Sequence, residues 1–266
     1  MSDFEEAEQK PKRRGIYLLP NLLTTAALFS GFYAILAAMD GRFEPAAMAI
    51  FLAMVLDGLD GRVARMTNTQ SAFGAEYDSL SDMVAFGLAP ALVMYVWALK
   101  GLGQPGWFAA FVYTAAAALR LARFNTQIGS ADKRYFQGIP SPAAAAIIGG
   151  SVWVSVDYQV DPASVAWLAG AATLIVGLLM VSNFRYHSFK EIDPRDKVPF
   201  IVLVVVMLVF SIIIWHPPLV LFLLFLAYGI SGPILTLLEL RRKRLERKGD
   251  GQVPAGGSSE TKNDAD

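Results

Sequence analysis

The chain has 266 residues, of which 55% are hydrophobic and 17% are charged, and its formal net charge is zero. This composition is too apolar for an ordinary soluble domain and is typical of a membrane protein. The sequence contains no cysteine, which excludes disulfide bonds and thiolate chemistry.

The amino-terminal end is set apart from the apolar body of the chain. Residues 1–14 are polar and close with a basic run, so we expect a mobile cytoplasmic tail there. Residues 15–240 hold the apolar segments and are predicted to form one transmembrane domain. We expect no separate soluble domain and no nucleic-acid partner.

Apolar segments recur throughout that domain, and each is about long enough to cross a bilayer as a helix. The predicted fold class is therefore all-α, a polytopic membrane helix bundle with about eight transmembrane helices. The segments lie near residues 17–39, 44–65, 78–99, 106–124, 141–157, 162–182, 198–215 and 217–238.

The basic residues predict how the bundle is oriented. If both termini are cytoplasmic, only Arg42 and Lys100 of the 23 Lys and Arg residues fall in outer loops. Basic residues concentrate in cytoplasmic loops of membrane proteins. We therefore expect both termini inside and an even number of spans.

Four aspartates lie where the second segment ends and the third begins: Asp57, Asp60, Asp78 and Asp82. Within each pair the residues are three or four positions apart, so each pair shares a helical face. The second segment runs inward and the third outward, which places all four carboxylates at the cytoplasmic side. Ionisable side chains in a membrane span are costly and indicate a functional site. One or two divalent cations would relieve their repulsion, and an all-oxygen site suits Mg²⁺ or Mn²⁺.

Small residues separate these aspartates. Gly58, Gly61 and Ala64 clear one side of the second helix, and Gly74 does the same near the start of the third. A nucleotide could approach the backbone on that side, and Arg65 could pair with its phosphates. The alternative is that the glycines only allow close helix packing, which is common in membranes. Packing alone does not require buried negative charge.

The complete pattern resembles the signature of the CDP-alcohol phosphatidyltransferase family. It reads Asp57-x2-Asp60-Gly61-x2-Ala64-Arg65-x8-Gly74-x3-Asp78-x3-Asp82, with no departure at any signature position. The resemblance implies a core of six membrane helices, to which this chain would add two. It also implies a cytosol-facing cavity for CDP and two divalent metal ions, CDP-diacylglycerol as the lipid substrate, and a homodimer.

Roles for single residues follow from the same resemblance. The metal ligands would be Asp57, Asp60, Asp78 and Asp82, and Asp82 would also be the base that takes the proton from the acceptor hydroxyl. The implied reaction is direct transfer of the phosphatidyl group to an alcohol with release of CMP. The residues that would bind CDP-diacylglycerol are Asp60, Gly61, Ala64, Arg65, Ser71 and Gly74.

Several segments along the chain resemble the branch of the family that uses L-serine as the acceptor. Arg120 and Arg123 lie at the cytoplasmic end of the fourth segment, where guanidinium groups could hold the carboxylate of serine, and Asn125 could add a neutral contact. The alternative is that both arginines are anchors that reach for lipid phosphate. The segments that carry this resemblance are 19–24, 81–90, 120–125, 136–142 and 179–190.

Other functions stay open at this point. Glycerol 3-phosphate, inositol phosphate or choline could be the acceptor, and the basic residues Arg120, Arg123, Lys133 and Arg134 would suit a phosphorylated one. A cation transporter could also place aspartates in a membrane, although spans four to seven carry no carboxylate in their interiors. Pro20, Asn21 and Thr24 either line the nucleotide cavity or only begin the first helix.

The carboxyl-terminal end is polar again. Residues 241–266 begin with basic residues and continue into a tail rich in Gly, Ser and Asp, which is predicted to be disordered. The basic residues either let the last helix lie against anionic headgroups or only stop its insertion. We expect an integral protein of the inner membrane of a bacterium, in contact with membrane lipids, with its active site facing the cytoplasm.

Overall fold

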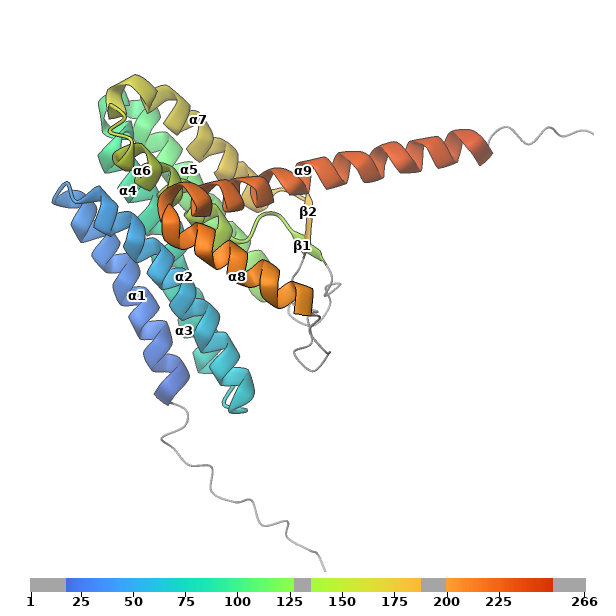
Figure 1. The fold of residues 1–266 in the computed structure, drawn as a ribbon, viewed down its shortest axis with the longest axis horizontal. Helices are drawn as coiled ribbons and strands as arrows, with labels where there is room; N and C mark the ends of the chain where they lie inside the picture. Colours follow the sequence, from blue (N-terminus) through green and yellow to red (C-terminus); the bar gives the residue numbers. More distant parts are fainter. Residues whose placement is uncertain (1–17, 127–134, 188–199, 251–266) are drawn as a thin grey trace, which may run out of the picture.

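The computed structural model describes residues 18–126, 135–187 and 200–250, which form a helical bundle with one two-stranded ribbon (Figure 1). The predicted tail 1–14 and most of 241–266 lie outside these residues. The longer helices are α1 (Leu18–Met39), α2 (Phe43–Met66), α3 (Ala72–Asp82), α4 (Ala89–Trp97), α5 (Gln104–Thr126), α6 (Ser141–Asp157), α7 (Pro162–Val181), α8 (Phe200–Trp215) and α9 (Pro217–Asp250).

Every predicted apolar segment coincides with a helix or with a continuous helical rod, so the helical fold class is confirmed. Among the described residues, four helical stretches are long and apolar enough to cross a membrane. How many of the other helices also span it stays a prediction, as does the orientation. The four stretches are Leu18–Met39, Ala72–Trp97, Pro162–Val181 and Pro217–Leu238.

The third rod differs from its predicted start. It begins at Ala72 rather than near residue 78, because the Ser71 hydroxyl accepts a hydrogen bond from the Gly74 backbone N–H at 3.0 Å and caps the helix. The rod then passes without a break through the π-helix η2 (Met83–Leu88) into α4. A π-turn adds a residue to the helical turn and thereby rotates α3 relative to α4 about their shared axis.

Small residues bring the helices together, as is usual in membranes. A Cβ on Gly31 of α1 would lie 2.6 Å from the Cα of Ala85, and one on Gly177 of α7 would lie 3.0 Å from the Cα of Tyr113. These backbones therefore meet with no space for a side chain. Alanines from α1, α2, α4, α5 and α6 make up much of the buried core between them.

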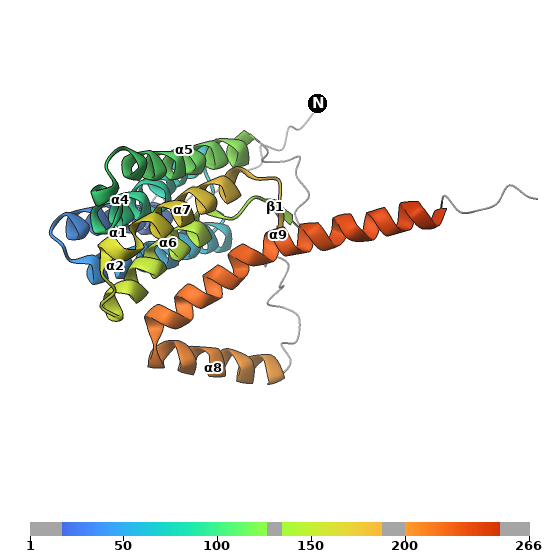
Figure 2. The same ribbon diagram turned by 90° about the horizontal axis from the view of Figure 1, so that it is seen from above.

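A short ribbon that the sequence did not predict joins the bundle to the last helix. Strand β1 (Tyr135–Gln137) pairs antiparallel with β2 (Arg185–His187), with Phe136 opposite Tyr186. Gly138 follows β1 at φ +78°, against the carbonyl of Met180, where a Cβ would clash. Helix α9 passes this ribbon and continues beyond the bundle, with α8 along its outer side (Figure 2).

Candidate active site

Carboxylates from two neighbouring helices meet where the carboxyl-terminal half of α2 lies beside that of α3. Single oxygens of Asp57, Asp60 and Asp78 all lie within 4.8 Å of one another. Asp82, one turn further along α3 than Asp78, interacts directly with Asp57. The structure therefore brings together the four aspartates that the sequence singled out.

Helix α1 supports this cluster from one side. The Thr24 hydroxyl donates a hydrogen bond of 2.7 Å to Oδ2 of Asp60. Asp60 is only 5% exposed. The Ser81 hydroxyl donates in turn to the backbone carbonyl of Thr24 at 3.1 Å. These contacts hold α1 against α2 and α3, so Thr24 supports the carboxylate cluster rather than only beginning a helix.

The cluster fits an oxygen-coordinated divalent cation. Oδ1 of Asp78 is buried, and no residue in the described part of the chain donates a hydrogen bond to it. A buried carboxylate oxygen without a donor is costly, and carboxylates this close repel one another. Carboxylate oxygens are ligands that suit Mg²⁺ and Mn²⁺. The residues present therefore fit the predicted metal site.

The side of α2 that carries the small residues is open. A Cβ on Gly58 would meet no atom within 4 Å, and one on Gly61 would meet only Nη1 of Arg65, at 3.6 Å. Gly31, in contrast, lies directly against another helix. No other described residue packs against Gly58, so close helix packing does not explain why this position is a glycine. The space beside it leaves room for a ligand.

Other predicted nucleotide-binding residues border the same region. Arg65 is exposed and interacts electrostatically with Asp60, and Ala64 is half-buried beside it. Gly74 lies near the start of α3, where a Cβ would be 3.1 Å from Oγ of Ser71 and 3.6 Å from Oδ1 of Asn21. Ser71 and Gly74 thus have a structural role in the helix cap, which the sequence reasoning did not foresee.

The predicted acceptor residues diverge in the structure. Arg120 is half-buried, interacts electrostatically with Asp82, and donates from Nη1 to Oγ of Ser141 at 2.8 Å. Its Nε is buried without a hydrogen-bond acceptor among the described residues. Arg123, one turn later, points elsewhere and donates to Oδ1 of Asn183 at 3.5 Å. Of the two arginines, only Arg120 is therefore placed beside the carboxylate cluster.

Asn125 also reaches the neighbourhood of the cluster. Its Nδ2 donates to Oγ of Ser79 at 3.0 Å, and Ser79 is the residue next to Asp78 on α3. Ser79 and Ser141 were not among the predicted site residues, although Ser141 lies within one of the segments that carried the family resemblance. Lys133 and Arg134, which would suit a phosphorylated acceptor, lie outside the described residues.

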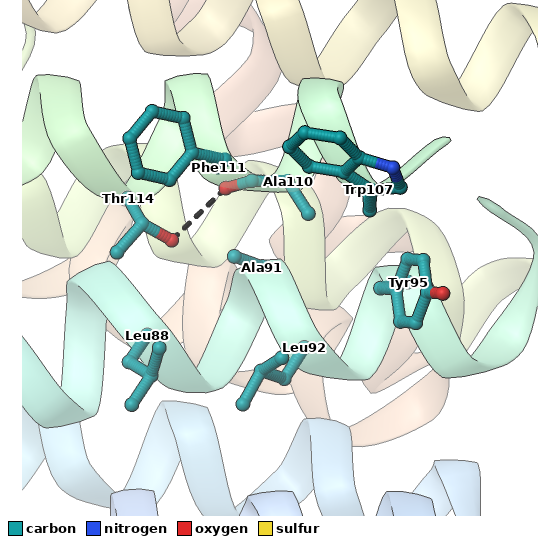
Figure 3. Close-up of a pocket in the computed structure, with 8 residues that line it drawn as sticks. All are labelled: Leu88, Ala91, Leu92, Tyr95, Trp107, Ala110, Phe111 and Thr114. Carbon is teal, nitrogen blue, oxygen red and sulfur yellow. Dashed lines mark hydrogen bonds between the residues drawn. The ribbon is translucent and has the colours of Figure 1, made fainter. Parts of the chain in front are cut away.

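A separate pocket of about 330 Å³ lies between α4 and α5 (Figure 3). Apolar side chains line it, among them Leu88, Trp107 and Phe111, and no carboxylate is among its lining residues. The Thr114 hydroxyl at its edge donates to the Ala110 carbonyl at 2.9 Å. This pocket belongs to the apolar surface of the bundle and not to the aspartate site.

Several known proteins are similar to this chain. The model of the CDP-alcohol phosphatidyltransferase family matches residues 17–179. The CDP-diacylglycerol–serine O-phosphatidyltransferase of Helicobacter pylori strain J99 is 38% identical over 229 residues, covering 85% of this chain and 94% of that protein. The protein of the same name from Methanocaldococcus jannaschii is 34% identical, covering 82% and 94%. The solved structure of phosphatidylinositol phosphate synthase from Mycobacterium tuberculosis superimposes with a TM-score of 0.48 at 18% identity, covering 62% of this chain and 80% of that one.

Proposed function

The chain belongs to the CDP-alcohol phosphatidyltransferase family, and we propose that it transfers the phosphatidyl group of CDP-diacylglycerol to the hydroxyl of L-serine, giving phosphatidylserine and CMP. Relatives that carry the name of this activity align with most of the chain. The observation within the structure that carries the proposal is the convergence of carboxylates from α2 and α3 within 4.8 Å.

Metal binding falls to the aspartate cluster. Asp57, Asp60, Asp78 and Asp82 would hold two divalent cations, either Mg²⁺ or Mn²⁺. Such cations would supply positive charge for the pyrophosphate of the substrate and for departing CMP. The buried, unpartnered Oδ1 of Asp78 supports this role, since it has an unused lone pair for a cation.

The nucleotide half of the lipid lies along the open side of α2. Gly61 and Ala64 leave its backbone accessible, and the exposed guanidinium of Arg65 pairs with a phosphate. Gly74 borders the same region from the start of α3. Ser71 adds a polar contact at the mouth of the site. The space beside Gly58 supports this placement, because no described residue fills it.

Asp82 acts as the general base. Its carboxylate takes the proton of the serine hydroxyl while the serine oxygen forms a bond to the phosphorus that carries diacylglycerol. The bond from that phosphorus to the oxygen of CMP breaks, and CMP leaves with the electron pair. Arg120, which interacts electrostatically with Asp82, lies where it can hold the carboxylate of serine beside the base. Asn125 adds a neutral contact from the side of Ser79.

The protein is an integral membrane protein with several spans. The distribution of basic residues supports eight spans with both termini in the cytoplasm, in the inner membrane of a bacterium. In this orientation the aspartate site faces the cytoplasm, where serine is dissolved. The homodimer that the family resemblance implies is part of the same proposal.

The reaction can be tested with the full-length protein in mixed micelles. Purified protein is given CDP-diacylglycerol and Mn²⁺ or Mg²⁺, together with serine, glycerol 3-phosphate, inositol phosphate or choline in turn. We expect CMP release and phosphatidylserine formation with serine, and no CMP release with the other three acceptors. CMP release with glycerol 3-phosphate but not with serine would show that the acceptor is not serine. No CMP release with any alcohol would contradict the proposed activity.

A further inference from the structure

Helix α9 lies outside the part of the chain that matches the family model, which ends at residue 179. It nevertheless packs against α6 and passes close to the ribbon of β1 and β2 (Figure 2). Its first polar side chain is Tyr228, after an unbroken apolar run from Pro217 to Ala227.

The turn of α9 around Tyr228 is held in a defined position. The Tyr186 hydroxyl on β2 donates 2.9 Å to the Gly229 carbonyl, and the Tyr186 ring lies against Gly232, where a Cβ would clash. The rings of Tyr186 and Tyr228 are tilted against each other, with centroids 5.5 Å apart. Tyr186 is fully buried, so the ribbon fixes the rotation of this turn.

The same turn is packed against the start of α6. A Cβ on Gly229 would lie 2.8 Å from Cδ1 of Ile147 and 3.4 Å from Cδ1 of Ile139. Two residues after Ile139 comes Ser141, whose hydroxyl accepts the hydrogen bond from Arg120. Tyr228 and Arg120 are accordingly close enough to interact electrostatically, as Arg120 also does with Asp82. An element outside the family core thus reaches the proposed acceptor arginine.

We propose that Tyr228 is a specificity-determining residue, whose hydroxyl acts with the Arg120 guanidinium to hold the carboxylate of an amino-acid acceptor; this rests on the proposed function. A carboxylate accepts several hydrogen bonds, and a phenol and a guanidinium are both donors to it. The two donors should not affect binding of the lipid substrate, because its phosphates are held at α2 and α3 in the proposed function. Residues outside the shared family core are also where members with different acceptors are free to differ.

The test compares Tyr228→Phe with the wild type on two acceptors, serine and serinol, in which a hydroxymethyl group replaces the carboxylate. Loss of a hydrogen bond to a charged group is expected to raise the KM for serine about tenfold. The KM for CDP-diacylglycerol and the rate with serinol should stay within about twofold of the wild type. Tyr33→Phe is the matched control, since Tyr33 meets Arg42 at the far end of the bundle.

The outcomes separate the inference from the function on which it rests. Unchanged serine kinetics in Tyr228→Phe overturn the inference while the wild-type activity stands. An equal loss with serine and serinol also overturns it, because the hydroxyl would then act through the fold and not through the carboxylate. A wild type that releases no CMP with serine removes the proposed function and the inference with it. The midpoint of thermal unfolding in detergent verifies that the variant is folded.

Discussion

The Tyr113 hydroxyl donates a hydrogen bond of 3.1 Å to the backbone carbonyl of Phe86, and both residues are fully buried. Phe86 lies in the π-helix that directly follows Asp82, four residues before Pro90. Proline has no N–H, so it cannot supply the donor that this carbonyl would receive in an α-helix. A side chain from α5 therefore completes the backbone of the rod that carries Asp78 and Asp82.

Tyr113→Phe should destabilise the fold and disturb the metal site together. The Phe86 carbonyl would lose one donor in a buried position, at a cost of about 0.5–1.5 kcal/mol. We expect a lower midpoint of thermal unfolding in detergent and weaker Mn²⁺ binding, because the π-turn sets how α3 faces α2. Tyr95→Phe is the matched control on α4. Unchanged stability and Mn²⁺ affinity in Tyr113→Phe would show that the π-turn does not depend on this bond.

Thr24→Val should weaken metal binding with little effect on the fold. The substitution removes the hydroxyl that orients Asp60 and keeps a side chain of similar shape. Loss of a group that orients a metal ligand typically lowers metal affinity about tenfold or more. Calorimetric titration with Mn²⁺ measures this, with Thr114→Val as a control whose hydroxyl bonds only within α5. Equal affinities in the two variants would contradict the role of Thr24.

Asp82→Asn should lose turnover while Asp57, Asp60 and Asp78 still hold metal and the protein still binds lipid. An amide cannot accept the proton of the acceptor hydroxyl, so CMP release should fall by about 10²–10⁴. Asp78→Asn should instead lose Mn²⁺ binding, because Oδ1 of Asp78 has no other partner among the described residues. Near-normal turnover in Asp82→Asn would remove this residue from the role of base.

The two arginines of α5 should differ in their effect on serine. Arg120 lies beside Asp82, whereas Arg123 bonds to Asn183. Arg120→Lys keeps the charge but loses the planar pair of donors, so it should raise the KM for serine more than that for CDP-diacylglycerol. Arg123→Lys should leave both constants nearly unchanged. Equal effects of the two substitutions would favour the interpretation of both arginines as lipid anchors.

Gly58→Ala and Gly31→Ala separate a ligand-facing glycine from a packing one. A methyl group on Gly58 meets open space, and alanine favours a helix by about 0.5–1 kcal/mol, so stability should hold or rise. The KM for CDP-diacylglycerol should nevertheless increase. Gly31→Ala should lower the midpoint of thermal unfolding, because its Cβ would lie 2.6 Å from Ala85. Loss of stability in Gly58→Ala without a change in that KM would reverse the assignment.

Local periodicity explains what could be predicted without a structure. Asp57 and Asp60, like Asp78 and Asp82, share a face in any α-helix, because the helical repeat does not depend on the neighbours. Reversal of chain direction between two spans then places both pairs at one membrane side. Hydropathy located the helices for the same reason, since the cost of exposing polar groups to lipid acts on each segment alone.

Features that depend on contacts between distant segments were not predictable. The three-residue strands have too little sequence for a pattern, and only their pairing with each other makes them visible. The early start of α3 depends on the cap at Ser71, which an average over hydropathy does not detect. The π-turn has its local cause in Pro90, but its donor comes from Tyr113 on another helix.

Composition and spacing by themselves determined the membrane class, the family and the four carboxylates. The tertiary structure alone decided that Gly58 faces open space while Gly31 faces a helix, that Arg120 and not Arg123 interacts with Asp82, and that Tyr228 of α9 lies close enough to Arg120 to interact with it. The physical reason is that these distinctions depend on how each helix is rotated about its axis. That rotation is set by the packing of all its neighbours at once, and no single segment of sequence contains it.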